Sequence, residues 1–350
     1  MSGAPAQRVN EDERRVLIPE RVALPPSFAA LRVLRIETLG GETMGTTWSA
    51  KIAVPAGTDL SPLRQGIEAV LARIIDEMSP WEPASHITRF NTAAAGTWHR
   101  LPDGFFKVLS AALDWAERSG GAYDPTLGAS VKLWGFGPGA QRSGIPDTAS
   151  LEQARAQGGW QRVLLDGQTA SAYQPGGLHL DLSSIAKGFA VDEVIRHLQR
   201  QGIANMLVEI GGELRGEGLK PDGTPWWIEL ERPRGAQNTG YVLPDTVLAL
   251  SGLSVATSGD ERRYFDVAGR RYSHTLDPRT GAPIVHDLVS VTIVAADCMT
   301  ADALATVLTV LGPEAAPVFA AENGIAARFV RFDAGHISED LSPALAAMLD

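Results

Sequence analysis

The amino-acid sequence predicts an α+β fold in which helices pack on largely antiparallel sheets. Alternating apolar and polar residues, which are typical of half-buried strands, recur along the 350-residue chain. Segments with the apolar spacing of amphipathic helices lie between them. The two kinds of segment do not alternate as regularly as in a parallel strand–helix–strand protein, which favours antiparallel sheets. A hydrophobic content of 44% is enough for a full core.

Residues 1–32 are expected to be an N-terminal extension, followed by a single domain over 33–350. The extension mixes charges with Pro19, Pro25 and Pro26 and shows no apolar period, so disorder is one expectation for it. Neither a signal peptide nor an apolar run of transmembrane length is evident, so the chain is expected to be cytoplasmic.

Strand patterns begin after this extension. Residues 31–38 and 46–54 alternate in the manner of strands, and a glycine-bounded loop over 40–45 separates them. A hairpin is expected over 262–276, turning at Ala268 and Gly269. The other expected strands cover 162–167, 170–182, 205–216, 225–231, 247–257, 288–295 and 326–331.

Helical patterns lie between these strands. In residues 63–78 the apolar side chains share one face, and the pattern stops at Ser79 and Pro80. Glycines follow several other helical patterns directly, as is typical of helix ends. The Gly- and Pro-rich stretch 134–146 is expected to be a loop. The remaining expected helices cover 103–119, 151–157, 183–201, 299–311 and 315–322.

The charge balance and cysteine count exclude some classes of protein. A net charge of −10 argues against nucleic-acid binding and against docking on an anionic membrane. An acidic protein that binds a pyrophosphate needs a cation to offset the repulsion. The single cysteine, Cys298, cannot form a disulfide within the chain and is interpreted as buried filler.

The segment 299–306 carries a candidate metal site. Asp302 and Thr306 are four residues apart, so a helix presents both on one face. A carboxylate and a hydroxyl are suitable ligands for Mg²⁺, whose remaining coordination positions are filled by waters and phosphates. The structural alternative, favoured for this segment alone, is a helix start with Thr300 as cap and Asp302 in the first turn. Zinc is not expected, because His and Cys residues do not cluster.

The segment 181–188 carries a candidate anion site. Ser183 or Ser184 can cap the helix that follows, and a helix start offers free N–H groups to a phosphate. Lys187 lies one turn further on and can reach the same anion, whereas Asp181 can bond a ring nitrogen or an amide of a ligand. The alternative is a capped amphipathic helix with an exposed lysine.

Glycines, prolines and aromatic residues over 120–128 and 133–138 suggest a wall that approaches a flat ligand. Trp81, which lies between two prolines, can stack on a ring system. The alternatives are an irregular surface loop and a plain packing anchor.

Small hydroxyls and arginines over 254–264 and 272–281 suggest a cradle for a diphosphate. His274 lies inside this region and can serve as a general base or orient a hydroxyl, although a lone histidine is more often structural. A Ser-His-Asp triad is not evident.

Eight segments of the chain, taken in order, resemble the ApbE family of FAD:protein FMN transferases. The resemblance extends over about residues 39 to 312. Each segment alone is a weak signal, whereas eight in the family's order are specific. The matching segments are 42–47, 85–91, 121–126, 133–137, 181–188, 256–260, 271–281 and 299–306.

The resemblance implies roles for individual residues and a fold of two T-fold-like halves that form one unit. Asp302 and Thr306 match Mg²⁺ ligands of the family, and a further ligand is expected from Ser184 or the carbonyl of Ala186. The residues that match FAD-contacting positions are Met44, Trp81, Ala122, Tyr123, Asp124, Asp181, Lys187, Thr275 and Leu276.

The resemblance also implies an activity: Mg²⁺-dependent transfer of FMN from FAD to a Ser or Thr hydroxyl of a target flavoprotein, with release of AMP. Lys187 is expected to assist, and His274, or Asp181 as the weaker alternative, to take the hydroxyl proton. Two other functions are kept: an FAD pyrophosphatase that yields FMN and AMP, and a non-enzymatic protein that binds or stores FAD. Many relatives are exported or lipid-anchored, and this chain shows neither signal.

Overall fold

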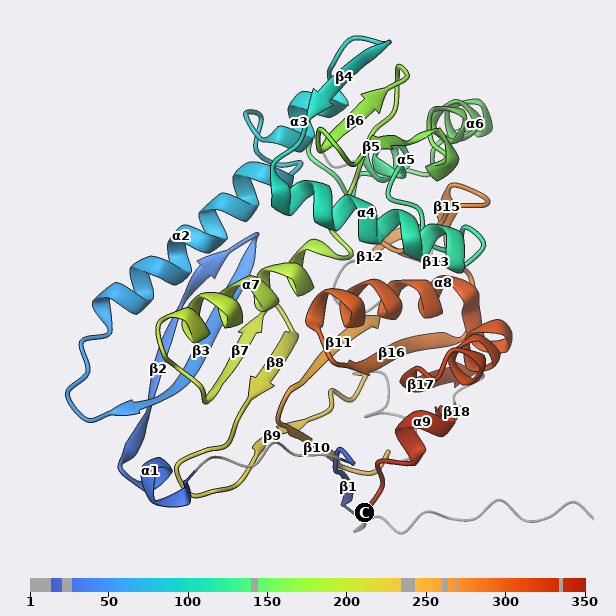
Figure 1. Cartoon of the computed structure of the whole chain (residues 1–350). Coiled ribbons are helices and arrows are strands. Elements are labelled where there is room, and N and C mark those ends of the chain that lie inside the picture. Colours follow the sequence, from blue (N-terminus) through green and yellow to red (C-terminus); the bar gives the residue numbers. More distant parts are fainter. Residues whose placement is uncertain are drawn as a thin grey trace, which may run out of the picture.

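The computed structural model describes residues 14–20, 27–139, 144–233, 243–259, 264–267, 270–333 and 336–350. Its centre is an eight-stranded sheet in which every neighbouring pair of strands is antiparallel (Figure 1). The strands, in the order in which they lie in the sheet, are β18 (His336–Leu341), β17 (Ala326–Asp333), β16 (Leu288–Ala295), β11 (Leu253–Gly259), β8 (Glu213–Glu217), β7 (Met206–Ile210), β3 (Thr46–Pro55) and β2 (Leu34–Thr43).

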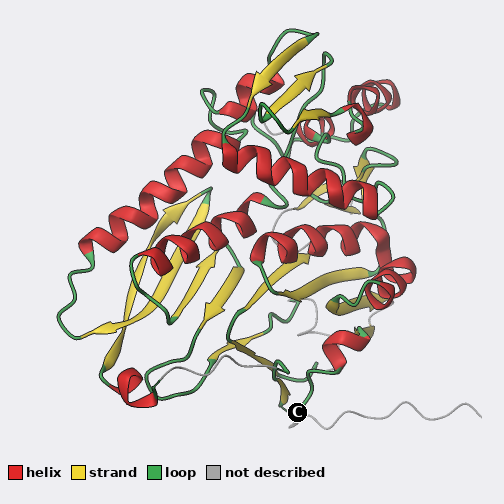
Figure 2. Ribbon diagram, in the orientation of Figure 1, coloured by secondary structure: helices red, strands yellow, loops and turns green. Residues whose placement is uncertain are grey.

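Three long helices cover one face of this sheet (Figure 2). They are α2 (Ser61–Met78), α7 (Ala186–Arg200) and α8 (Cys298–Glu322). Gly312 interrupts α8 with φ of 77°, so this helix consists of two segments joined at a kink. The two halves of the sheet and its helices therefore follow the same chain order: two strands, then two helical segments, then two further strands. The predicted α+β fold, with two similar halves in one unit, is confirmed.

The space between the helices and the sheet is filled by one apolar core. Amphipathic α2 and α7 turn their buried residues to the sheet, and α4 (Asp103–Arg118) packs against α2 and α8 from outside. Ile67, Phe105 and Phe189 are among its fully buried side chains. Burial of each such side chain is worth about 1.5–3 kcal/mol, so this core holds the two halves together.

Smaller elements surround this centre. A three-stranded sheet of β4 (Thr97–Arg100), β6 (Ser171–Gln174) and β5 (Leu164–Asp166) lies beyond α4, as Figure 1 shows. A second three-stranded sheet joins β1 (Arg15–Leu17), β10 (Thr246–Leu250) and β9 (Trp226–Glu229). The other elements are α1 (Phe28–Arg32), α3 (His86–Asn91), α5 (Gly128–Leu133), α6 (Thr148–Gln157), a 3₁₀ turn (Trp160–Arg162), β12 (Tyr264–Val267), β13 (Arg270–Ser273), β14 (Leu276–Asp277), β15 (Ala282–Pro283) and α9 (Pro343–Ala346).

Several predicted strands proved to be shorter than expected. The single strand over 205–216 is a hairpin, because Gly211 and Gly212 adopt positive φ values of 63° and 105° and reverse the chain between β7 and β8. Likewise the strand over 247–257 is divided by Ser251 and Gly252 into β10 and β11. The strand over 170–182 ends at Gln174, before two glycines with positive φ.

Other differences concern helices. The helix expected from residue 183 begins at Ala186, because residues 183–185 form a turn. The helices α1, α3 and α5 were not predicted, since five or six residues are too few to show a helical period. The predicted turn at 268–269 lies outside the described residues, although β12 and β13 pair as expected.

Within the described residues, one helix has the length and composition of a membrane span, against the expectation that no run approaches that length. It is α8, with 25 residues and a mean hydropathy of 1.5. More than half of its most apolar window, 56%, is buried inside the protein. Because α8 packs on α7, β11 and β16, its apolar composition is that of a core helix.

Part of the expected N-terminal extension packs on the domain. β1 pairs in parallel with β10, and Leu17 is fully buried in a second apolar cluster with Trp226 and Leu248. The backbone of Asp350 also bonds to Val16. A domain boundary near residue 32 stays a prediction, and β1 makes contacts that the sequence pattern did not suggest.

These contacts predict that Leu17→Ala lowers the free energy of unfolding by about 2–5 kcal/mol, because it leaves a cavity among buried side chains. Urea denaturation followed by circular dichroism measures this loss. Ile18→Ala is the matched control, since Ile18 is 37% exposed and its truncation is expected to cost about 1 kcal/mol or less. Equal losses in the two variants would show that β1 does not dock as described.

Candidate active site

A cavity of about 890 Å³ opens where the N-termini of α7 and α8 meet the tip of the β2–β3 hairpin and the loops after α2 and α4. This volume suits a ligand of dinucleotide size. The structure brings every predicted site residue to its wall. These residues are Met44, Trp81, Ala122, Tyr123, Asp124, Asp181, Ser184, Ala186, Lys187, His274, Thr275, Leu276, Asp302 and Thr306.

The first turns of α7 and α8 touch at one end of the cavity. The N–H of Gly188 donates to Asp302 Oδ2 at 2.9 Å. Gly188 is the third residue of α7, so its N–H is among those without a partner inside the helix. A Cβ at Gly188 would lie 2.2 Å from the carbonyl oxygen of Cys298 and 2.8 Å from Cβ of Asp302. Only glycine therefore lets the two helices approach so closely.

A buried charge cluster extends from this contact. Lys187 Nζ forms an ion pair with Glu213 Oε1, and the Glu213 side chain is 4% exposed. In the part of the chain that the structure describes, Glu213 Oε2 is buried without a hydrogen-bond partner. Glu213 was not predicted, because it follows a glycine pair at the start of a short strand and belongs to no motif. Its position beside Lys187 results from a contact across the fold.

The pKa values in this cluster are governed by burial. Burial raises the pKa of Glu213 to about 7, against the opposing charge of Lys187, and the negative Asp302 raises it further. Burial also raises the pKa of Asp302, which Lys187 and the Gly188 N–H counteract. The carboxylates of Glu213 and Asp302 thus share the single ammonium group of Lys187 in a region with little solvent. This excess of negative charge favours binding of a further cation.

The donor set fits a magnesium ion better than a softer metal. No group of three His, Cys, Asp or Glu side chains suited to a metal converges within the described residues. The candidate ligands are instead the carboxylate of Asp302, the hydroxyl of Thr306 and the carbonyl of Ala186 or hydroxyl of Ser184, all at the cavity wall. Few protein oxygens, with waters and phosphates as further ligands, are what Mg²⁺ accepts.

Other predicted site residues form hydrogen bonds within the walls of the cavity. Ser184 Oγ donates to Tyr123 Oη at 2.9 Å, and burial raises the pKa of the Tyr123 hydroxyl, which therefore stays neutral. Asp124 accepts hydrogen bonds from the Thr126 N–H and hydroxyl at 2.8 and 2.6 Å and from the Trp160 N–H at 3.2 Å. The Asp124 carboxylate therefore shapes the loop after α4.

The opposite part of the cavity offers flat and apolar surfaces. Met44 has a φ of 49° at the tip of the β2–β3 hairpin, and Trp81 is 55% exposed at the edge of the cavity. His274 is half-buried and forms a T-shaped ring pair with Phe136, with centroids 6.3 Å apart. Thr275 is buried beside it. These surfaces suit a ring system on the ligand.

The predicted diphosphate cradle is described only in part. Thr257, Ser258 and Gly259 at the end of β11 line the cavity. Asp260 and the arginines Arg262 and Arg263 lie outside the described residues. Arg279, the arginine of the second predicted segment, pairs with Asp277 and is not among the residues at the cavity wall. The roles of Arg262 and Arg263 stay untested.

Fold and cavity together define an α+β protein whose cavity suits a flat, phosphorylated ligand. Comparison with known proteins gives the family. The profile of the ApbE family matches residues 44–329. The FAD:protein FMN transferase of Vibrio cholerae is 41% identical over 288 residues, 82% of this chain and 85% of that protein. That of Haemophilus influenzae is 37% identical over 331 residues, covering 92% and 94%.

The structural comparison agrees. The apo form of the flavinyl transferase ApbE of Pseudomonas stutzeri superposes with a TM-score of 0.83 at 38% identity, covering 90% of this chain and 97% of that one. The flavin transferase ApbE of Vibrio cholerae gives 0.82 at 35% identity, with 90% and 99% covered. The chain therefore belongs to the ApbE family and is an enzyme of the transferase class. The family resemblance inferred from the motifs is confirmed.

The raised pKa of Glu213 predicts a pH-dependent stability. Between pH 4.5, its usual pKa, and pH 7 the folded protein keeps a proton that the unfolded chain releases. The contribution of Glu213 to stability is therefore largest below this window and falls as the pH rises through it, by up to about 3 kcal/mol. Glu213→Gln removes the titrating group and with it this decrease in stability. The free energy of unfolding of the variant, relative to that of wild type, is therefore expected to be higher at pH 8 than at pH 5.

Urea denaturation in EDTA at the two pH values measures this difference. Glu42→Gln is the control, because Glu42 is exposed on β2 and its replacement is expected to leave the pH profile unchanged. An unaltered profile in Glu213→Gln would mean that the buried carboxyl group does not titrate in this range.

Proposed function

We propose that the protein transfers the FMN part of FAD to a Ser or Thr hydroxyl of a target flavoprotein and releases AMP, with Mg²⁺ bound in the cavity. The observation that carries this proposal is that a buried charge cluster and surfaces for a flat ring share one cavity. The names of the relatives support the flavin substrate. The metal and the acceptor hydroxyl rest on the chemistry of the lining residues.

The reaction is a substitution at phosphorus. The hydroxyl oxygen of the target bonds to the FMN-side phosphorus of FAD, and the bond from that phosphorus to the bridging oxygen breaks. The electron pair stays on the bridging oxygen, which leaves with AMP, and the hydroxyl proton passes to a base. Positioning and charge stabilisation carry most of such a reaction.

The residues of this chain divide that work. Lys187, fixed by its ion pair with Glu213, stabilises negative charge on the diphosphate. His274, at the cavity wall beside Phe136, takes the proton of the target hydroxyl. Asp302 and Thr306 hold the metal ion, which supplies charge neutralisation at the diphosphate when bound. Trp81 and Met44 contact the flavin.

Asp302→Asn is expected to lower the rate of flavin transfer by about 100-fold or more, because the amide keeps the shape of the side chain and removes its charge. The assay incubates the variant with FAD, Mg²⁺ and cell lysate, scans a gel for covalent flavin fluorescence and quantifies AMP. Asp76→Asn is the control, because the Asp76 side chain is 64% exposed on α2 and it is expected to keep wild-type activity.

The same assay separates the alternatives. Release of AMP without labelled protein would indicate a pyrophosphatase, and tight FAD binding without AMP release would indicate a storage protein. Full labelling by Asp302→Asn would rule out the metal assignment.

A further inference from the structure

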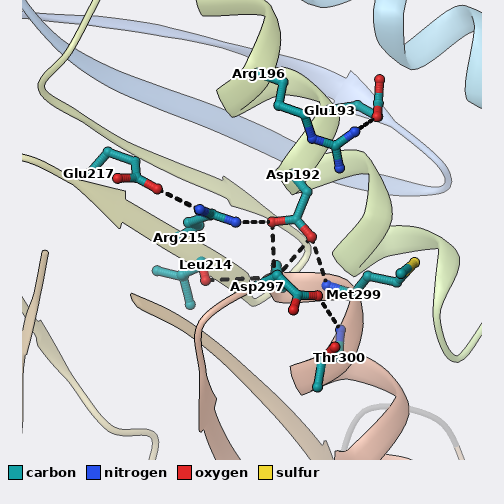
Figure 3. Close-up of polar contacts among 10 residues, drawn as sticks. Asp192, Glu193, Arg196, Leu214, Arg215, Glu217, Asp297, Met299 and Thr300 are labelled. Carbon is teal, nitrogen blue, oxygen red and sulfur yellow. Dashed lines mark hydrogen bonds and ion pairs between the residues drawn. The ribbon is translucent and has the colours of Figure 1, made fainter. Parts of the chain in front are cut away.

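The two helices at the cavity cap each other. Asp302 of α8 accepts the N–H of Gly188 in the first turn of α7. In the opposite direction, Asp192 of α7 accepts the N–H groups of Cys298 and Met299, the first two residues of α8, at 3.0–3.1 Å. Figure 3 shows the Asp192 carboxylate directed at this helix start. Each helix thus satisfies free N–H groups of the other, a role that a preceding residue normally fills.

Asp192 is held from its other side by an arginine of the sheet. Arg215 Nη1 donates to Asp192 Oδ1 at 2.7 Å, and Arg215 Nε and Nη2 donate to Glu217 at 2.8 and 2.6 Å (Figure 3). Asp192 is 2% exposed and does not line the cavity. Arg215 lies in β8 two residues after Glu213, so the strand that carries the partner of Lys187 also anchors the start of α8.

We propose that Asp192, oriented by Arg215, is a positioning residue: it sets the Asp302 carboxylate relative to Gly188 and Lys187 for the chemistry of the cavity. The expected effect of this position on catalysis rests on the proposed function. Asp302 lies one turn beyond the residues that Asp192 holds, so a change in the direction of α8 at its start moves Asp302. Catalysis of group transfer is sensitive to displacements of about 1 Å.

Asp192→Asn tests the proposal. Asp192 accepts from Arg215 at Oδ1 and from the Met299 N–H at Oδ2. Asparagine replaces one of these oxygens with an NH₂ group, which only donates, so one of the two hydrogen bonds is lost. The Gly188 N–H donates to Asp302 and not to the Asp192 carboxylate, so its hydrogen exchange reports on the bond to Asp302. In the variant we expect exchange of the Gly188 amide to be at least about 10-fold faster by NMR.

Two further readouts separate positioning from folding. Mn²⁺ titration in the presence of FAD, followed by electron paramagnetic resonance, is expected to show a dissociation constant raised about 10-fold. The kcat of flavin transfer is expected to fall about 10- to 100-fold while the KM for FAD changes less than about 3-fold, because Trp81 and Met44 lie on other elements.

Asp297→Ala is the matched control. Asp297 caps the same helix start through the Thr300 N–H at 2.9 Å, and its carboxylate makes no hydrogen bond with α7 among the described residues. Both variants are expected to lower Tm, whereas only Asp192→Asn changes Gly188 exchange and Mn²⁺ affinity. If Asp192→Asn does not fold, Arg215→Lys keeps the charge, loses the planar contact to Asp192 and Glu217, and is expected to shift both readouts in the same direction.

Wild-type Gly188 exchange and Mn²⁺ affinity in a folded Asp192→Asn or Arg215→Lys variant would overturn the proposal, as would equal shifts in Asp297→Ala. If the wild-type protein neither binds Mn²⁺ nor transfers flavin, the proposed function fails. Gly188 exchange would then still decide whether Asp192 positions Asp302.

Discussion

The close approach of α7 and α8 at Gly188 is the constraint on which the cavity depends. No Cβ fits between Gly188 and Cys298, so the two helix starts lie in direct contact. Each helix start carries roughly half a positive charge, and two such ends side by side repel unless negative groups lie between them. Asp192 and Asp302 are those groups, each contributed by the opposite helix. The packing contact and the charge arrangement therefore stabilise each other.

The cavity belongs to both halves of the fold. Lys187 and Glu213 come from the first half, and Asp302, Thr306 and the hydroxyls at the end of β11 come from the second. β8 and β11 pair across the junction, so the sheet is continuous where the charge cluster lies. Neither half alone carries the cluster, and the site therefore requires that the whole sheet folds as one unit.

The long helices and strands and the motif residues could be predicted from the sequence, because both carry local signals. The helix over 63–78 shows its period directly, and the motifs that contain Asp181 and Asp302 are dense enough to mark a site. Glu213 and Asp192 were not predicted from the sequence, because their importance arises from contacts across the fold. Asp192 also lies within a helical pattern, where a carboxylate is usually solvated. Its carboxylate is paired inside the protein with Arg215, which lies 23 residues further along the chain on the second strand after α7, and no sequence spacing reveals such a partner.

The charge balance of the cluster indicates how the site is completed. Glu213 and Asp302 bring two negative charges, and Lys187 brings one positive charge. Burial, together with the neighbouring Asp302, raises the pKa of Glu213 to about 7, so below this pH Glu213 binds a proton and the imbalance is reduced. A diphosphate would add negative charge to a protein whose net charge is already −10. Protonation of one carboxyl group cannot offset that addition, whereas a divalent cation beside the two carboxylates can.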